Sequence, residues 1–290
     1  GIIGQEIKMY DDEGSWQVAL NLLKALYHNN PVKIDIAGTV ESISHITKDT
    51  LYKCYNTYYN PSNMVVTVCG DVEPREVFEL VEKYVRTDRE CGEVTSVYPD
   101  EPVSVCQKYI EAKSKVALPL FSLGFKDNYP KSGDALLKRE TAIHLICKLL
   151  AGRSSDLYTG MYEDGLINEE FGTDIMTEPL FSCVSFCGES NDPKEVQHRI
   201  MDEIERLRRD KFDEADFDRI KRAHLGEFMR AFNDVEATAS MVERNILNEV
   251  NIFNLPSVLD SIDPAYVYDV FNQIFTEETS ALSVVFPNDK

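Results

Sequence analysis

The stretch ITKDTLYKCYNTYYNPSNMVVTVC, residues 46–69, has a second copy further along this chain. Laid without gaps on residues 262–285, it matches apolar residues at helical spacing and then a continuous apolar run. This pattern predicts a helix followed by a strand that is buried on both faces. A repeated helix–strand unit indicates a duplicated α+β fold rather than a doubly wound one. The matched helical pairs are Leu51 with Val267, Tyr52 with Tyr268, Tyr55 with Phe271, Asn56 with Asn272 and Tyr59 with Phe275.

The repeat extends upstream after a small shift in loop length, where residues 3–12 align with residues 225–234. In this alignment Gly4 meets Gly226, whereas Glu6 meets Phe228. Wound as a helix at about 100° per residue, residues 1–12 place Glu6 in the middle of an apolar arc. We therefore expect Glu6 to be buried. The rest of the arc consists of Met9, Ile2, Tyr10, Ile3 and Ile7.

Two interpretations of Glu6 follow from its place in the arc. A buried, unpaired carboxylate is costly, so it protonates, finds a cationic partner or binds a metal. The simpler interpretation is a glutamate at a helix end that reaches a lysine or faces water. Because the second copy has Phe228 at this position, the fold itself does not require a charge there. This comparison favours metal ligation by Glu6.

The remaining pattern predicts a series of helices and strands on either side of a polar linker at residues 87–103. We expect residues 1–90 to form the C-terminal remnant of one domain and residues 91–290 to form a second domain. The expected strands are residues 64–69, one or two within 106–125, a hairpin of 171–176 and 181–187, and residues 281–286. The expected helices are residues 1–12, 16–26, one capped by Thr47, one opened near Pro74, 135–150, one ending near Tyr162, 193–209, 213–232, 234–250 and 264–275.

Composition excludes several classes of partner. The formal net charge of −20 repels a nucleic-acid backbone and an anionic membrane surface, and no apolar run approaches a membrane span. Seven widely spaced cysteines match neither a disulfide framework nor a Cys-x-x-Cys zinc site, which favours a cytoplasmic location. The chain begins with Gly1 in the middle of a helical pattern, so we expect a piece of a longer protein.

Four strings carry a family resemblance: GTVESI at residues 38–43, YNPSNMVVTVCGDVEP at 59–74, LAGRSSDLY at 150–158 and EDGL at 163–166. Together they resemble the pitrilysin/insulinase family of zinc peptidases, which includes mitochondrial processing peptidase and its bacterial relatives. The resemblance implies duplicated ferredoxin-like α/β units of the processing-peptidase-like fold. The first of these units would be incomplete in this chain.

The resemblance also implies where zinc would bind. In that family a His-x-x-Glu-His motif supplies two ligands and the general base, and a glutamate on a following helix supplies the third ligand. Glu6 stands at this third position. None of the five histidines stands in such a motif, and the string nearest to it, His224 to Phe228, ends in Phe instead of His. We interpret His224 and Glu227 as surface helix residues, expect no catalytic residue in this chain, and expect the chain alone to be inactive.

Substrate and partner expectations come from the same resemblance. Many family members hold the substrate with Arg and Tyr of an Arg-Glu-x-x-Gly-Leu-x-Tyr motif, but here Met161 and Asn168 occupy those positions. We therefore expect a homodimer, or a heterodimer with a paralogous subunit, acting on a peptide or an unfolded protein. The alternative is a non-catalytic scaffold that binds a peptide or a partner without cleaving it. Cys183 and Cys187 alternate on one strand face, and we interpret them as core residues.

Overall fold

The computed structural model describes residues 1–290 except 86–93, 98, 129–131, 179 and 289–290. Its helices are α1 Ile2–Asp11, α2 Gly14–Leu26, α3 Val40–Ser44, α4 Lys48–Tyr58, α5 Pro74–Tyr84, α6 Gly133–Ala151, α7 Asp156–Glu163, α8 Pro193–Asp210, α9 Glu214–Ala231, α10 Val235–Leu247, α11 Leu255–Asp260 and α12 Pro264–Ile274. Its strands are β1 Tyr109–Ser114, β2 Leu120–Asp127, β3 Gly172–Glu178, β4 Phe181–Glu189 and β5 Ser280–Pro287. Short 3-10 helices are η1 Pro31–Lys33, η2 Pro61–Asn63 and η3 Ile252–Asn254. None of the helices described is long and apolar enough to cross a membrane.

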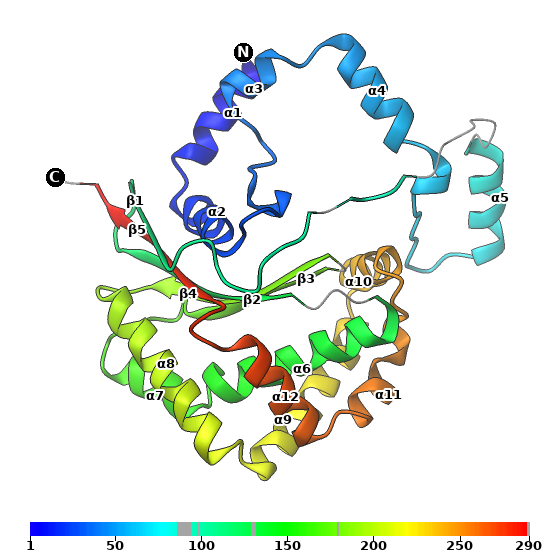
Figure 1. Ribbon diagram of the computed structural model, residues 1–290. Coiled ribbons are helices and arrows are strands. Elements are labelled where there is room, and N and C mark those ends of the chain that lie inside the picture. The colour runs from blue at the N-terminus through cyan, green and yellow to red at the C-terminus, as the bar shows by residue number, and fades with distance from the viewer. Residues whose placement is uncertain (86–93, 98, 129–131, 179, 289–290) are drawn as a thin grey trace.

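The strands form one sheet in the order β1-β5-β2-β4-β3 (Figure 1). All neighbouring pairs are antiparallel except β1 and β5, which are parallel. The chain runs from β2 through α6 to the β3–β4 hairpin, and then through helices to β5. This is the β-α-β-β-α-β order of a ferredoxin-like unit, with β1 added at one edge. The sequence-based prediction of an α+β fold is confirmed, and its ferredoxin-like form is realised in the second unit.

Helices α6, α8 and α12 cover one face of the sheet, α9 packs on α6, and together they enclose the main core (Figure 1). Side chains from both layers interlock there. The Phe125 ring lies 5.0 Å from the Phe275 ring and 6.1 Å from the Phe186 ring. Phe125, Phe186 and Phe275 are completely buried. The helix predicted at residues 135–150 is α6, and most of its residues are buried.

The opposite face of the sheet is covered by α2, which comes from the first segment of the chain. Leu22 of α2 lies directly over Gly124 of β2, where an added Cβ would come within 2.7 Å of the leucine side chain. The absence of a side chain at Gly124 therefore allows this close approach. After the helix, the buried Tyr27 donates a hydrogen bond from its hydroxyl to the Ser182 carbonyl oxygen at 2.7 Å. The first segment of the chain, residues 1–85, is thus anchored on the sheet.

Glu101 links the turn that follows α2 to the sheet. Its carboxylate accepts backbone hydrogen bonds from His28, Asn29 and Asn30 at 2.7–2.8 Å and pairs with the Lys126 ammonium at 2.6 Å. Burial by itself raises the pKa of Glu101, but these donors outweigh it and lower the pKa to about 2. Burial also lowers the pKa of Lys126, against the attraction of Glu101. One carboxylate therefore joins the turn after α2 to β2.

The internal repeat is reproduced in local geometry. Pro264 and Ile274, the ends of α12, lie 216 positions after Lys48 and Tyr58, the ends of α4. Both helices have side-chain N-caps, one from Thr47 and one from Asp263, that accept a hydrogen bond three residues on. Aromatic stacking is repeated too. The ring centroids are 5.4 Å apart for Tyr55 with Tyr59 and 5.5 Å apart for Phe271 with Phe275.

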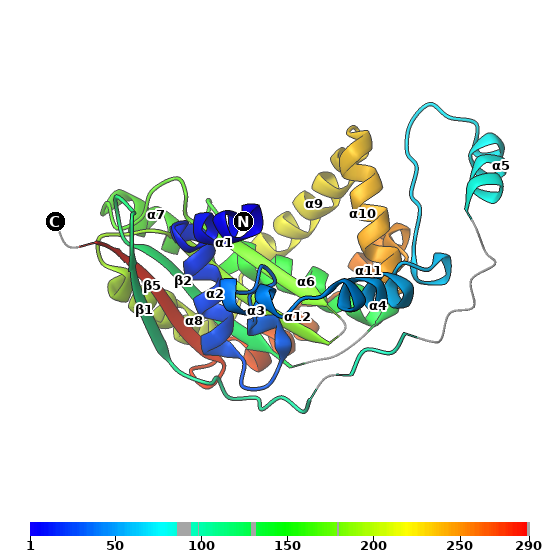
Figure 2. The ribbon, with the colours of Figure 1, turned by 90° about the horizontal axis from the view of Figure 1, so that it is seen from above.

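The two copies differ in what covers them. Phe271 and Phe275 are fully buried, whereas Tyr55 is 46% exposed and Tyr59 is 61% exposed. The apolar spacing of residues 51–59 would give α4 an inward face like that of α12, but in this structure that face is not covered, and α5 likewise contains no buried residue. In Figures 1 and 2, α4 and α5 lie away from the sheet.

The strand predicted at residues 64–69 is also absent. Met64, Val66 and Val68 are at least half exposed, and the run belongs to no sheet. A strand requires a neighbour for its hydrogen bonds, and the described part of the chain supplies none beside this run. The predicted boundary at residues 90 and 91 lies outside the described residues. The described parts of the predicted linker, residues 94–97 and 99–103, contain no helix or strand.

Candidate functional site

Glu6, the residue predicted to bind metal, lies on α1 with its side chain exposed. Our expectation that Glu6 is buried in an apolar arc is wrong, because most of that arc is itself exposed. Ile2 is 83% exposed, and Ile3 and Met9 are each 60% exposed. Ile7 is the member of the arc that is buried, and α1 packs against α2. The metal-binding role of Glu6 stays a prediction.

Glu6 lines a small cavity of about 260 Å³ between α1, the start of α2 and the segment near Ile36. Tyr10 and Trp16 form its aromatic wall with ring centroids 5.3 Å apart. The indole of Trp16 donates a hydrogen bond to the Asp35 carboxylate at 3.1 Å. Among the described residues, no hydrogen bond or ion pair holds the Glu6 carboxylate, so its oxygens are open to a ligand from outside.

The described residues do not by themselves form a zinc site. Zinc requires three or four nitrogen, sulfur or carboxylate ligands around one point. No group of three or more His, Cys, Asp or Glu side chains in the described part of the chain is arranged to hold a metal ion. Glu6 therefore supplies one candidate ligand and not a complete centre.

The counterpart of Glu6 in the second copy, Phe228, is buried against Phe232, with ring centroids 5.0 Å apart. This contact confirms that an apolar residue suits the position in α9. The interpretation of Glu227 as a surface helix residue is confirmed, since Glu227 is exposed and pairs with Lys148.

His224 differs from our expectation of a surface residue, because its side chain is only 15% exposed. Its ring centroid lies 5.5 Å from that of His144 on α6. Burial, followed by repulsion from His224, lowers the pKa of His144 to about 4. Burial also lowers the pKa of His224. Two neutral imidazoles therefore pack between α6 and α9 at neutral pH.

Met161 and Asn168, at the positions where many family members hold the substrate, have different surroundings. Met161 is fully buried in the main core, where it can contact no substrate. Asn168 is half-buried and donates a hydrogen bond to the Glu189 carboxylate at 2.8 Å, while its own oxygen accepts from the Glu170 amide at 3.0 Å. Neither Met161 nor Asn168 supplies the positive charge of the motif's Arg.

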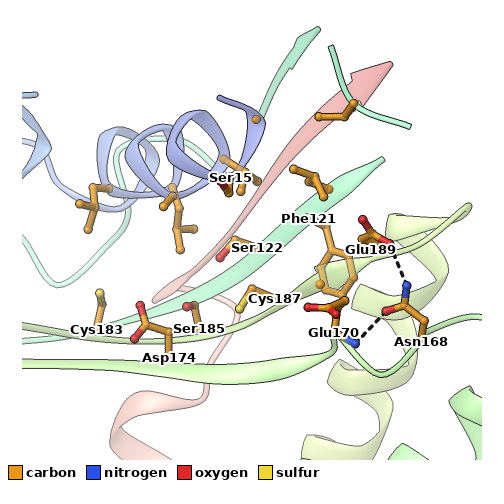
Figure 3. Close-up of a pocket in the computed structure, with 18 of the residues that line it drawn as sticks. Ser15, Phe121, Ser122, Asn168, Glu170, Asp174, Cys183, Ser185, Cys187 and Glu189 are labelled. Carbon is orange, nitrogen blue, oxygen red and sulfur yellow. Dashed lines mark hydrogen bonds between the residues drawn. The ribbon is translucent and has the colours of Figure 1, made fainter. Parts of the chain in front are cut away.

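Asn168 lies on the wall of a much larger cavity, of about 800 Å³, between α2 and the open face of the sheet (Figure 3). Sequence reasoning did not find this cavity, because its walls come from distant parts of the chain. The alternation of Cys183, Ser185 and Cys187 is the one signal that places several of its residues on one strand face. Burial, and then the charge of Asp174, raises the pKa of Cys183 to about 12. The same two causes raise the pKa of Cys187. Both thiols stay protonated at neutral pH. Cys183 is buried, as expected for a core residue, whereas Cys187 is only partly buried.

With this geometry established, comparison with known proteins identifies the family. The family model described as "Peptidase M16 inactive domain" matches residues 45–223, more than half of the chain. The chain belongs to the M16 peptidase family. This finding confirms the resemblance to pitrilysin-type zinc peptidases that the sequence motifs indicated.

Individual M16 relatives align along nearly the whole chain. YmfH of Bacillus subtilis (strain 168), named an uncharacterized zinc protease, is 34% identical over 293 residues, covering 99% of this chain and 68% of YmfH. YmxG of the same organism, also named an uncharacterized zinc protease, is 25% identical and covers 99% of this chain and 69% of YmxG. A crystal structure of an M16-like peptidase from Alicyclobacillus acidocaldarius superposes with a TM-score of 0.92 at 27% identity, covering 99% of this chain and 69% of that one.

Proposed function

We propose that this chain is the C-terminal portion of a zinc-dependent metalloendopeptidase that hydrolyses peptide bonds, and that it is inactive alone. The observation that carries the proposal is the 34% identity to a named zinc protease along 99% of this chain. The chain corresponds to 68% of that relative's length.

In this proposal Glu6 supplies one carboxylate ligand to the zinc ion. One feature supports the role. The repeat has the buried Phe228 at the equivalent position, so the fold does not need an acid there. The ligands that complete the centre would come from outside the residues described here.

We also propose that the protein acts in the cytoplasm as a homodimer, or as a heterodimer with a paralogous subunit, on peptide or unfolded-protein substrates. The exposed apolar side chains of the first segment support association with further protein. Ile2, Tyr55 and Phe78 are between 46% and 83% exposed. Large apolar side chains exposed to water in one segment are typical of a surface that binds other protein.

A non-catalytic scaffold is the second candidate function. The matched family model is that of the inactive domain, and Met161 and Asn168 stand where many members have the Arg and Tyr that hold substrate. A scaffold would bind a peptide or a paralogous chain without hydrolysis and would contain no zinc.

Zinc content and proteolysis of the full-length protein separate the two candidates. The protein is purified, dialysed against metal-free buffer and analysed by inductively coupled plasma mass spectrometry. We expect about one zinc ion per chain, and we expect Glu6→Gln to lower zinc affinity at least about tenfold. Glu41→Gln, which changes an exposed glutamate on α3, is the matched control and should leave zinc content unchanged.

Digestion of fluorescently labelled casein is measured on the same samples. The full-length protein should cleave casein in a manner that a chelator inhibits, whereas residues 1–290 alone should not. Zinc binding that is unaffected by Glu6→Gln would disprove the ligand role. Full-length protein that lacks both zinc and proteolysis would support the scaffold instead.

A further inference from the structure

The cavity between α2 and the sheet is built from chemically distinct walls (Figure 3). One wall is apolar and comes from α2, through Val18, Ala19 and Leu22. The floor is the open face of β2 and β4, where small side chains leave room above the sheet. Its volume of about 800 Å³ falls within the range of small-molecule sites in proteins.

Two serine residues that are buried overall turn their hydroxyl groups into this cavity from the floor. Ser122 of β2 is 3% exposed and Ser185 of β4 is 6% exposed, and both line the cavity. Within the described part of the chain, neither hydroxyl has a hydrogen-bond partner. Both hydroxyls are therefore free to donate a hydrogen bond to, or accept one from, water or a polar ligand in the cavity. Figure 3 shows both side chains on the strands beneath α2.

The charged groups on the cavity wall all have the same sign. The described lining includes the carboxylates of Glu170, Asp174 and Glu189 and no lysine, arginine or histidine. Asp174 is paired in register with Ser185 across β3 and β4, so this acid lies next to one of the two serines. Glu189 accepts one hydrogen bond, from Asn168. No ion pair to these three acids is found among the described residues.

We propose that this cavity binds an aliphatic chain that ends in a cation, such as the side chain of a lysine or arginine residue. The apolar wall from α2 would contact the aliphatic stem, while the carboxylates and the serine hydroxyls would accept hydrogen bonds from the ammonium or guanidinium group. An anionic ligand is disfavoured, because it would meet three like charges with no compensating cation. The thiols of the buried Cys183 and the partly buried Cys187 are protonated, so neither is a thiolate nucleophile in this cavity.

Isothermal titration calorimetry of the full chain with n-hexylamine tests the proposal. 1-Hexanol and hexanoate are the neutral and anionic comparators of similar length. We expect hexylamine to bind at least about tenfold more tightly than 1-hexanol, and hexanoate to bind more weakly than either. Nα-acetyl-lysine N-methylamide distinguishes the source of the cation. If it binds as hexylamine does, the site accepts a lysine side chain within a peptide, whereas binding of hexylamine alone assigns the site to small free amines.

Three variants keep the test specific. Asp174→Asn should weaken hexylamine binding roughly three- to tenfold and leave hexanol binding unchanged. Ala19→Phe, at an exposed position of α2 on the apolar wall, should weaken binding of both compounds by occupying the cavity. Asp218→Asn, at an exposed position of α9 in the helix layer, should change neither. Equal affinity for amine and alcohol, or unchanged amine affinity in Asp174→Asn protein with an unaltered unfolding temperature, would overturn the proposal.

Discussion

At the scale of single residues, the chain places its acids in very different environments. Glu6 is exposed and has no partner among the described residues, whereas Glu101 is surrounded by donors. The sequence pattern drew attention to Glu6, because an acid interrupts an apolar arc there. Nothing in the pattern indicated Glu101, since its donors lie near residues 28–30 and 126. An acid's role thus depends on groups that are distant in sequence.

Replacing Glu101 by glutamine should destabilise the protein in a pH-dependent way. The substitution leaves the buried Lys126 without its counter-ion, which costs about 3 kcal/mol of unfolding free energy at neutral pH. The pKa of Glu101 is lowered from 4.5 to about 2, so the stability that its charge contributes is complete above pH 4.5. That contribution should decline as the pH falls from 4.5 towards 2.

Urea unfolding monitored by circular dichroism at several pH values measures this difference. The difference in unfolding free energy between the natural protein and the Glu101→Gln variant should become smaller as the pH falls below 4.5. Glu82→Gln, which changes an exposed glutamate on α5, provides the control and should be nearly neutral. A gap that stays constant down to pH 2 would contradict the assignment of the low pKa to Glu101.

At the scale of elements, α4 and α12 have equivalent sequence patterns, bounds and caps but different surroundings. The helix itself is encoded locally by its capping residue and apolar spacing, so both copies form it. Burial is not encoded locally. The face of α12 packs on β2 and α6, whereas the equivalent face of α4 meets no sheet in the described part of the chain.

Truncation of equivalent rings in the two helices should therefore have unequal effects. Phe271→Ala should cost about 3–5 kcal/mol, because it removes a fully buried ring and leaves a cavity. Tyr55→Ala at the matched position should cost less than about 1 kcal/mol in this chain, since the ring is 46% exposed. Urea unfolding of the two variants gives both values. Similar losses in the two variants would show that α4 is covered in solution.

At the scale of the whole molecule, the first segment is joined to the second mainly through α2. The helix packs against β1, β2 and β5, and Leu22, Leu26 and Tyr27 are buried there. Figure 2 shows α4 and α5 on the far side of the molecule from β1 and β5. Residues beyond the α2 anchor make few buried contacts, which makes them the part most open to protease.

Limited trypsin digestion should therefore cut first around α4 and α5, where Lys53, Arg75 and Lys83 are exposed. The fragment that carries α2 should stay bound to the sheet domain through its buried contacts and the Glu101 hydrogen bonds. Size-exclusion chromatography followed by mass spectrometry should find the two fragments in one peak. In Glu101→Gln protein the fragments should separate more readily. Separation of the fragments immediately after cleavage of the natural protein would contradict this account.

The sequence by itself determined most elements of the second unit, the internal repeat and the family. Local spacing, caps and turn residues specify helices such as 135–150 and the hairpin at 171–187, because these signals act between residues close in the chain. Only the tertiary structure decided which apolar faces are covered, that Glu6 is exposed, and that three carboxylates from β3, β4 and a loop share one cavity. The physical reason is that burial and electrostatics depend on neighbours brought together by folding, which local periodicity does not specify.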